Sequence, residues 1–246
     1  MTDLTLVVTA HAETVVAGPT MRSADAAVAH ARAQGLSVET IVALDAATEA
    51  TTAYFSQPAL DHWERRTYAE GDLGRVRNAV LPDTAGRYVA FLDADDLLAE
   101  NWLAAAVAML RAGEERGERW IAHPELNVFF DGARSVLLNI DQDSPLFTPY
   151  FLYVRNLYDA LCVAPREAYL ETPYGGVDLP HGVGFEDWQF AVESMARGWR
   201  HKVVPDTVIF KRRRDDSLVV TSSARHAILR SLPALAIDRV ADLGSQ

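Results

Sequence analysis

The chain has 246 residues, of which 49% are apolar and 23% charged, and this balance predicts a globular fold with a sizeable core. Its 23 basic and 34 acidic side chains give a net charge of −11. Such an acidic surface repels phosphate backbones, which argues against nucleic-acid binding. The single cysteine, Cys162, excludes an internal disulfide and fits a reducing compartment.

The sequence also gives expectations about location. Met1–Asp3 lack the basic start and apolar stretch of a signal peptide, so we expect no secretion. No run approaches the ~20 apolar residues that a membrane-spanning helix needs. We therefore expect a cytoplasmic protein. Any membrane association would be peripheral, at the inner face of the membrane.

The chain opens with a strand–helix–strand pattern. Leu4–Thr9 and Val38–Leu44 are short β-branched runs that predict strands buried on both faces. Between them, Ser23 is expected to cap an alanine-rich helix over 24–34 that ends at Gly35. This order predicts a parallel sheet with helices on its faces.

The next segments continue the alternation. Residues 51–57 and 73–79 are expected to be helical, whereas Trp63–Asp72 is polar enough to predict loops. Tyr88–Leu92 is a third buried strand, and apolar residues at helical spacing predict a long helix over 100–116.

The second half of the chain has shorter elements. Leu126–Phe130 and Ser135–Ile140 flank an Asp-Gly turn and predict an antiparallel hairpin. A helix is expected over 188–197, followed by two short strands over 201–204 and 207–211.

An acidic run, Asp93-Ala94-Asp95-Asp96, follows the third strand. On an extended chain positions i and i+2 point to one side, so Asp93 and Asp95 can present two carboxylates to one cation at the carboxyl edge of the sheet. Hard oxygen ligands suit Mg²⁺ or Mn²⁺, which typically also hold a diphosphate. The alternative is a set of solvated acids that cap the next helix.

A second acidic pair, Glu186-Asp187, opens the expected helix after Gly182–Phe185. Helix N-termini stabilise carboxylates, so capping alone explains the pair. The functional interpretation is that Asp187 accepts a proton from an acceptor hydroxyl, which is worth about 10²–10⁴ in rate.

Three further features could contact a nucleotide. Asp45 ends the second strand, where an acid can accept a hydrogen bond from a base or ribose, or brace a turn. Arg77 could bind phosphate or form a structural salt bridge. The Lys211–Arg214 cluster could clamp a diphosphate or form a solvated basic face.

Other chemistries lack their motifs. The sequence contains no GxGxxG after a strand, no GxxxxGK[ST], no GxSxG and no HExxH. Cys162 sits in an apolar run and is interpreted as a buried filler rather than a nucleophile. His123-Pro124-Glu125 offers too few ligands for a metal and is interpreted as structural or acceptor-side.

Taken in order, these segments resemble the family 2 glycosyltransferases with the GT-A fold. The landmarks are LTLVVTAHAE, IVALDAATEATT, GDLGRVRNAVLPDTAGRYVAFLDADD and GFEDWQF. The resemblance covers about residues 4–217 and is most specific from Arg75 to Asp96. Later segments resemble a bacterial subgroup of unassigned sugar specificity: HPELNVFF, NLYDALCVAPREAYLETPY and HKVVPDTVIFKRRRDDSL.

The resemblance implies an α/β fold of the GT-A type. It has a Rossmann-like, mostly parallel central sheet flanked by helices, with a small antiparallel hairpin and acceptor-side loops. Residues 1–120 would be the nucleotide-sugar-binding half, and 121–221 the acceptor-binding and catalytic-base half of the same domain. Residues 222–246 would be a helical tail that packs on the core, forms a homodimer or touches a membrane.

The implied activity is transfer of a sugar, with inversion, from a nucleoside-diphosphate sugar to a hydroxyl acceptor, assisted by Mn²⁺ or Mg²⁺. Asp187 matches the catalytic base, with Glu186 beside it, and Asp93 and Asp95 match the metal-binding pair. Ser217 matches the end of a family loop. The nucleotide-sugar-binding set would be Thr9, His11, Asp45, Arg77, Asp93, Ala94, Asp95, Lys211, Arg212 and Arg213. The acceptor-side set would be His123, Glu125, Asn156 and Trp188.

The chain also departs from the family pattern. Thr9-Ala10-His11 stands where a proline and a tyrosine or asparagine are commoner, and Ala46 replaces a usual glycine, so the sequence does not name the nucleobase. The QxxRW motif of processive synthases is missing, which favours a single addition. Two alternatives stay open: a retaining GT-A transferase, and a catalytically inactive nucleotide-sugar-binding domain. A sugar nucleotidyltransferase would need a Gly-rich, Arg-containing loop that 9–16 lacks.

Overall fold

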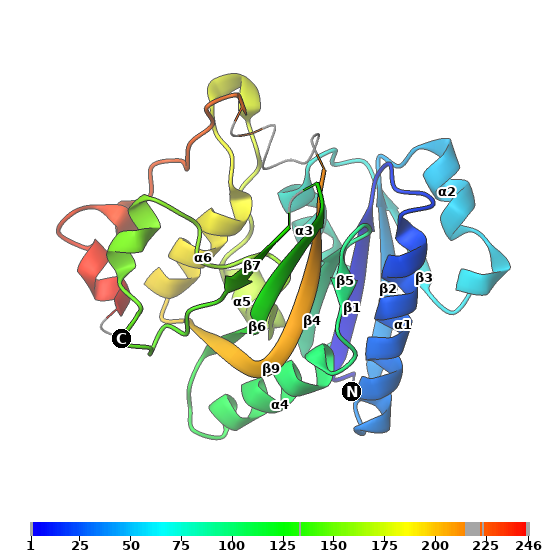
Figure 1. The fold of residues 1–246 in the computed structure, drawn as a ribbon, viewed down its shortest axis with the longest axis horizontal. Coiled ribbons are helices and arrows are strands. Elements are labelled where there is room, and N and C mark those ends of the chain that lie inside the picture. Colours follow the sequence, from blue (N-terminus) through cyan, green and yellow to red (C-terminus); the bar gives the residue numbers. More distant parts are fainter. Residues whose placement is uncertain (1, 133, 215–221, 223, 245–246) are drawn as a thin grey trace.

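The computed structural model describes residues 2–132, 134–214, 222 and 224–244, which are built around one mixed sheet (Figure 1). Within these residues the sheet has nine strands in the order β3-β2-β1-β4-β8-β6-β9-β5, with β7 paired to β6. The strands are β1 (Leu4–Ala10), β2 (Val38–Asp45), β3 (Glu64–Tyr68), β4 (Tyr88–Asp93), β5 (Leu97–Leu98), β6 (Trp120–Asp131), β7 (Ser135–Leu138), β8 (Val163–Pro165) and β9 (Arg200–Arg213).

The sheet is mostly parallel. β3, β2, β1 and β4 run parallel to one another, and β6 runs parallel to β9. The short β8 joins the two groups by antiparallel pairing with both β4 and β6, and β6 and β7 form an antiparallel hairpin. The predicted α/β architecture, with a parallel sheet and one hairpin, is confirmed.

Two layers of helices cover the sheet because both of its faces are apolar. Side chains alternate along a strand, so Leu4, Leu6 and Val8 of β1 belong to one core cluster and Val7 to the other. The first cluster packs on α1 (Ala17–Ala33), α2 (Glu49–Phe55) and α4 (Trp102–Glu114). The second packs on α3 (Leu73–Val80), α5 (Arg166–Glu171) and α6 (Glu186–Ala196).

Three local predictions were wrong. α1 begins six residues before Ser23, whose hydroxyl instead donates to Thr20 O inside the helix (2.8 Å). The polar stretch expected to be loop contains β3, an exposed edge strand without an apolar pattern. The two short strands after α6 are one strand, β9, whose pairing with β6 shifts register between Pro124 and Leu126.

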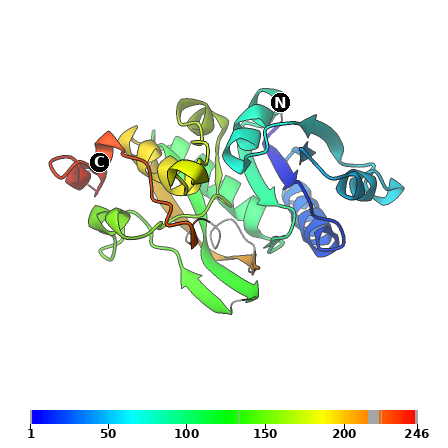
Figure 2. The ribbon, with the colours of Figure 1, turned by 90° about the horizontal axis from the view of Figure 1, so that it is seen from above.

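The C-terminal tail packs on the core rather than forming the regular helix that its pattern predicts. It contains the short 3-10 helices η5 (Pro233–Leu235) and η6 (Val240–Gly244). Leu232, just before η5, and Val240 and Leu243 of η6 are buried against α6 and the 3-10 helix η3 (Pro149–Tyr153). Figures 1 and 2 both show the tail, α6 and η3 side by side at one end of the molecule. The remaining 3-10 helices are η1 (Pro58–Leu60), η2 (Leu81–Asp83) and η4 (Leu179–His181).

Two sequence expectations concern chemistry outside the site. Cys162, directly before β8, is buried, and this burial raises the pKa of its thiol to about 11. The sulfur therefore stays protonated and unreactive. No helix in the described part of the chain is long and apolar enough to cross a bilayer.

Candidate active site

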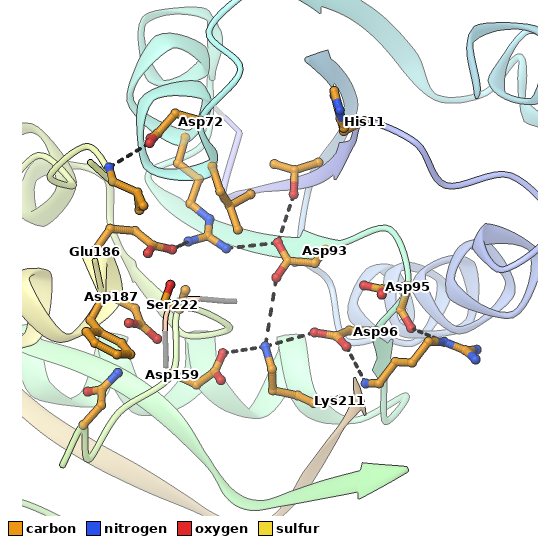
Figure 3. A pocket seen from close by; sticks show the side chains of 18 of the residues that line it. His11, Asp72, Asp93, Asp95, Asp96, Asp159, Glu186, Asp187, Lys211 and Ser222 are labelled. Atoms are coloured by element: carbon orange, nitrogen blue, oxygen red, sulfur yellow. Dashed lines mark hydrogen bonds and ion pairs between the residues drawn. The ribbon is translucent and has the colours of Figure 1, made fainter. Parts of the chain in front are cut away.

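A large cavity lies at the carboxyl ends of the parallel strands, where open α/β sheets bind ligands. Its volume is about 810 Å³. Segments from across the chain line it: the ends of β1, β2 and β4, the end of β9, and the start of α6 (Figure 3). Glu186 and Asp187 lie on one side of it in this view, and Asp95 and Asp96 on the other. The two acidic motifs therefore meet in one cavity.

Asp93, the last residue of β4, is held by three neighbours. Thr9 Oγ1 and Arg77 Nη2 both donate to its Oδ1, each at 3.0 Å, and Lys211 Nζ lies 4.0 Å from Oδ2. Burial opposes ionisation of this carboxyl, but the charges of Arg77 and Lys211 outweigh it and lower its pKa. Asp93 therefore stays ionised.

Arg77 joins the two acidic motifs. Its side chain is 1% exposed, and its Nη1 donates to Glu186 Oε1 at 3.3 Å while Nη2 holds Asp93. The guanidinium also lies 5.2 Å from the ring centroid of Tyr174. Burial raises the pKa of Glu186 while Arg77 opposes that rise. Arg77 thus forms the structural ion pair that the sequence allowed, and it fixes the spacing of the motifs (Figure 3).

The chain turns after β4, so Asp93 and Asp95 do not project side by side from one extended strand. Asp96 N donates to Asp93 O at 3.0 Å, so the extended geometry expected for the run ends at Asp93. Asp95 Oδ2 lies 3.1 Å from Arg214 Nη2. Burial and the charge of Asp93 raise the pKa of Asp95, against the opposing charge of Arg214. Asp95 is therefore the carboxylate of the run whose negative charge is least compensated by buried cations.

Lys211 is an internal cation rather than a solvated one. Its Nζ lies 3.0 Å from both Asp96 Oδ2 and Asp159 Oδ1. Burial opposes the charge of Lys211, but Asp159 and Asp96 outweigh burial and raise its pKa. Burial raises the pKa of Asp96 to about 7 despite Lys211. The lysine of the basic run thus ties β9 to β4 and to the loop that carries Asp159.

The two following arginines are tethered at the rim of the cavity. Arg212 Nη1 donates to Asp131 Oδ2 at 2.7 Å, and its backbone N donates to Asp96 Oδ1 at 2.7 Å. The Arg213 guanidinium lies 4.4 Å from the Phe129 ring centroid. Both side chains line the cavity and leave it a basic wall.

Asp187 occupies the first turn of α6, and its carboxyl lies beside Asp159 and Ser222 in the cavity (Figure 3). The residue before the helix, Phe185, has a left-handed backbone (φ 64°) that turns the chain into the cavity wall. Burial, then the charges of Glu186 and Asp159, raise the pKa of Asp187 to about 8. This carboxyl can exchange a proton near neutral pH.

The donor-side residues lie together at the strand ends. Asp45 Oδ1 accepts from Glu70 N (2.7 Å) and Gly71 N (3.2 Å), and His11 Nδ1 donates to Asp45 O (2.8 Å). Thr9, His11, Asp45 and Ala94 all line the cavity. Part of the Asp45 carboxylate is therefore used to brace a loop.

The acceptor-side residues divide into two pairs. Asn156 and Trp188 line the cavity. His123 is buried elsewhere, with its Nε2 2.8 Å from His201 Nδ1, and burial lowers its pKa to about 3. Glu125 accepts from a β9 backbone amide (2.8 Å). Neither His123 nor Glu125 is among the described residues that line the cavity.

Sequence reasoning missed several lining residues. Asp159 lies in a stretch without periodicity, so no pattern singled it out. Glu13 follows the first strand in a polar loop that resembles any surface loop, and Ser222 lies at the start of the tail. Ser217, which the family pattern places at a loop end, lies outside the described residues.

Comparisons with known proteins found a matching family model and similar solved structures. Residues 7–118 match the model of glycosyl transferase family 2. The S. aureus TarS fragment 1-349 in complex with UDP-GlcNAc has the same fold, with a TM-score of 0.62 at 15% identity over 87% of this chain and 60% of the TarS chain. GalNAc-T7 with UDP, GalNAc and Mn²⁺ gives a TM-score of 0.59 at 15% identity, over 87% of this chain and 44% of the other. No curated protein matches the sequence.

The fold is the GT-A fold that the sequence pattern predicts. The match of residues 7–118 supports the resemblance to glycosyl transferase family 2 that the sequence pattern indicates. The chain spans 60% of the length of the TarS fragment, and at such low identity the solved structures establish the fold alone.

Proposed function

We propose that the chain transfers a sugar, with inversion, from a nucleoside-diphosphate sugar to a hydroxyl acceptor, assisted by one divalent metal ion. The observation that carries this proposal is the Arg77 bridge. It places Glu186-Asp187 and Asp93-Asp95 in one cavity although the motifs are far apart in sequence. In this scheme residues 1–120 bind the donor and residues 121–221 supply the acceptor side and the base.

The donor would lie against the carboxyl ends of β1, β2 and β4. Thr9, His11 and Asp45 would receive the nucleoside, because they line the cavity there. The TarS and GalNAc-T7 structures contain UDP or a UDP-sugar, so uridine is the first base to test. Arg212 and Arg213 would contribute positive charge towards the diphosphate.

Asp95, with Asp93 behind it, would hold Mn²⁺ or Mg²⁺. The donor set fits such an ion because Mg²⁺ is usually bound by one or two carboxylates and shared with substrate phosphates. Burial and Asp93 raise the pKa of Asp95, so a cation there would relieve repulsion between the two acids. When bound, the ion would neutralise charge that develops on the departing diphosphate. The GalNAc-T7 structure contains Mn²⁺.

Asp187 would act as the base from the side opposite the leaving group. The acceptor oxygen forms a bond to the anomeric carbon as the bond from that carbon to the phosphate oxygen breaks. The diphosphate leaves with the bonding electrons, and the acceptor proton passes to the Asp187 carboxylate. Arg77 and Lys211 act as positioning residues, because their hydrogen bonds and charges are already engaged by Asp93, Glu186, Asp96 and Asp159.

A thermal-shift panel tests the donor and metal assignments. We expect one nucleoside diphosphate, with UDP tested first, to raise Tm more strongly in the presence of Mn²⁺, because selective binding stabilises the fold by mass action. Asp95→Ala should remove the manganese-dependent part of this rise. Asp61→Ala, an exposed acid outside the cavity, should leave it unchanged. If the manganese-dependent part survives in Asp95→Ala, the metal assignment is wrong.

The cellular setting follows from the same proposal. We propose a cytoplasmic protein, because its one cysteine is a buried free thiol and nucleotide-sugars are the proposed donors. Peripheral contact at the inner face of the membrane and a homodimer formed through the tail are the two assemblies to examine next.

A further inference from the structure

A second cavity of about 610 Å³ adjoins the catalytic one. The two share Phe185 and Trp188, the residues on either side of the Glu186-Asp187 pair. A molecule whose hydroxyl reached Asp187 could therefore continue directly into the second cavity. The other residues that line the second cavity come from η3 and the tail: Leu152, Tyr153, Ala227, Ile228, Leu229, Arg230, Ser231, Leu232, Pro233, Leu235 and Ala236.

Hydrogen bonds join the walls of this second cavity to Gly182–Phe185, the segment before the Glu186-Asp187 pair. Ile228 N donates to Gly182 O (2.9 Å), and Gly184 N donates to Ile228 O (3.1 Å), so the tail is paired with the segment that leads to Asp187. Tyr153 Oη donates to Leu235 O at 2.8 Å and joins η3 to the tail. The second cavity, called the groove below, is thus held in place by hydrogen bonds between the tail, η3 and the segment before α6.

The chemistry of the groove is apolar. Arg230 and Ser231 are its main polar side chains, Tyr153 has already used its hydroxyl proton, and Arg230 donates to Gly176 O (2.8 Å). The described residues that line it include no carboxylate, although the protein carries a net charge of −11. A site for a sugar chain would present many hydrogen-bonding groups, whereas this one presents mostly hydrocarbon surface.

The side chain of Trp188 lies where the two cavities meet, because Trp188 lines both of them. Phe185, which also lines both, makes the junction aromatic. An acceptor with its reacting hydroxyl in the catalytic cavity and hydrocarbon beyond the junction would match this arrangement.

We propose that this groove binds the apolar aglycone of the acceptor, so that the substrate is a hydroxyl compound carrying an alkyl chain or hydrophobic ring. The proposal rests on the proposed function, since it takes Asp187 as the base. Ile228 is 68% exposed at this groove, and a ligand chain would cover it. Each buried methylene should tighten binding by about fourfold.

Calorimetric titration with methyl, butyl and octyl β-glucoside, each below its micelle concentration, tests this site without requiring transfer. We expect octyl glucoside to bind the protein at least about tenfold more tightly than butyl glucoside. Octyl glucoside has four more methylenes, and burying half of them gives roughly that factor. A negative heat-capacity change should accompany its binding, because apolar surface is buried. Methyl glucoside should bind most weakly.

Variants localise the effect. Ile228→Asp should weaken octyl glucoside binding at least about tenfold, because it places a charge on the apolar wall. Leu170→Asp, an equally drastic change at an exposed leucine outside both cavities, should leave it unchanged. Binding that ignores chain length or Ile228→Asp overturns the proposal, as does binding to phosphatidylcholine vesicles without binding to the monomeric glucosides.

The same preparations separate this proposal from the proposed function. The groove assignment alone would be wrong if glucoside binding to the wild type did not depend on alkyl-chain length while Ile228→Asp still bound nucleoside diphosphate. Chain-length-dependent binding without any nucleoside-diphosphate shift would keep the groove and remove the transferase assignment.

Discussion

Asp187→Asn should reduce sugar transfer by about 10²–10⁴, because an amide cannot take the acceptor proton. The wild-type rate should rise with pH towards a midpoint near 8, since burial and the Glu186 and Asp159 charges raise the pKa of Asp187 to about 8 and only its ionised form is a base. Donor-dependent product formation measured from pH 5.5 to 9.5 checks both points. A residual Asn activity with the same midpoint as the wild type would assign the titration to another group.

The same substitution predicts a stability change of known sign. The folded-state pKa of Asp187 lies above its ordinary value of 3.8, so its contribution to stability is present below pH 3.8 and lost as pH rises through about 8. Asp187→Asn should therefore gain Tm relative to wild type at pH 9, with little gain at pH 4. This readout shows that the variant is folded while its activity is lost.

Arg77→Met should be the most destabilising single change in the site. It leaves the buried carboxylates of Asp93 and Glu186 without their shared cation, and breaking a buried ion pair costs about 3–5 kcal/mol. We expect a fall in Tm of roughly 10 °C for a chain of this size. Arg65→Met, at a surface ion pair with Asp61, is the matched control and should change Tm by about 2 °C or less.

A second variant tests the cause of that loss. In Arg77→Met/Glu186→Gln one of the orphaned charges is neutralised, so part of the lost stability should return. In the presence of Arg77, Glu186→Gln should raise Tm less than it does in Arg77→Met, or should lower it, because it removes a carboxylate partner of Arg77. Additive effects of the two substitutions would mean that Arg77 and Glu186 are not coupled, contrary to the 3.3 Å contact between them.

The elements that position the site were predictable where the sequence has one clear hydrophobic pattern, either a buried apolar run or an apolar helical repeat. Apolar β-branched runs located β1, β2 and β4, and the acids at the end of β4 and the start of α6 followed from those strands and helices. The edge strand β3 was not predictable, because exposure on both sides leaves no alternation to detect. Ser23 was misleading since a serine inside a helix can bond to its own preceding turn.

The roles of the basic residues depended on register, which the sequence does not contain. Lys211 lies two residues after buried Ile209 on β9, so strand alternation turns it inward and turns Arg212 to the other face. Arg213 shares the face of Lys211 but is the last residue of the strand. From the sequence alone, any member of the basic run could have been the internal one. Asp159, its partner, lies in a loop whose conformation comes from tertiary contacts.

Arg77 illustrates the same limit. An arginine side chain on a helix ordinarily reaches solvent, yet α3 packs this arginine against Asp93 and Glu186. Only the meeting of α3, β4 and α6 gives the side chain its two partners. The sequence predicted the two acidic motifs, and the three-dimensional structure supplies the cation between them.

The anomeric configuration of the product tests the central claim most directly. A single displacement, with Asp187 receiving the proton opposite the leaving diphosphate, must invert the anomeric centre. ¹H NMR of the glycoside product should show the anomeric configuration opposite to that of the donor. Product with the donor's own configuration would contradict the account, because Asp187 could then not be the base of a one-step transfer.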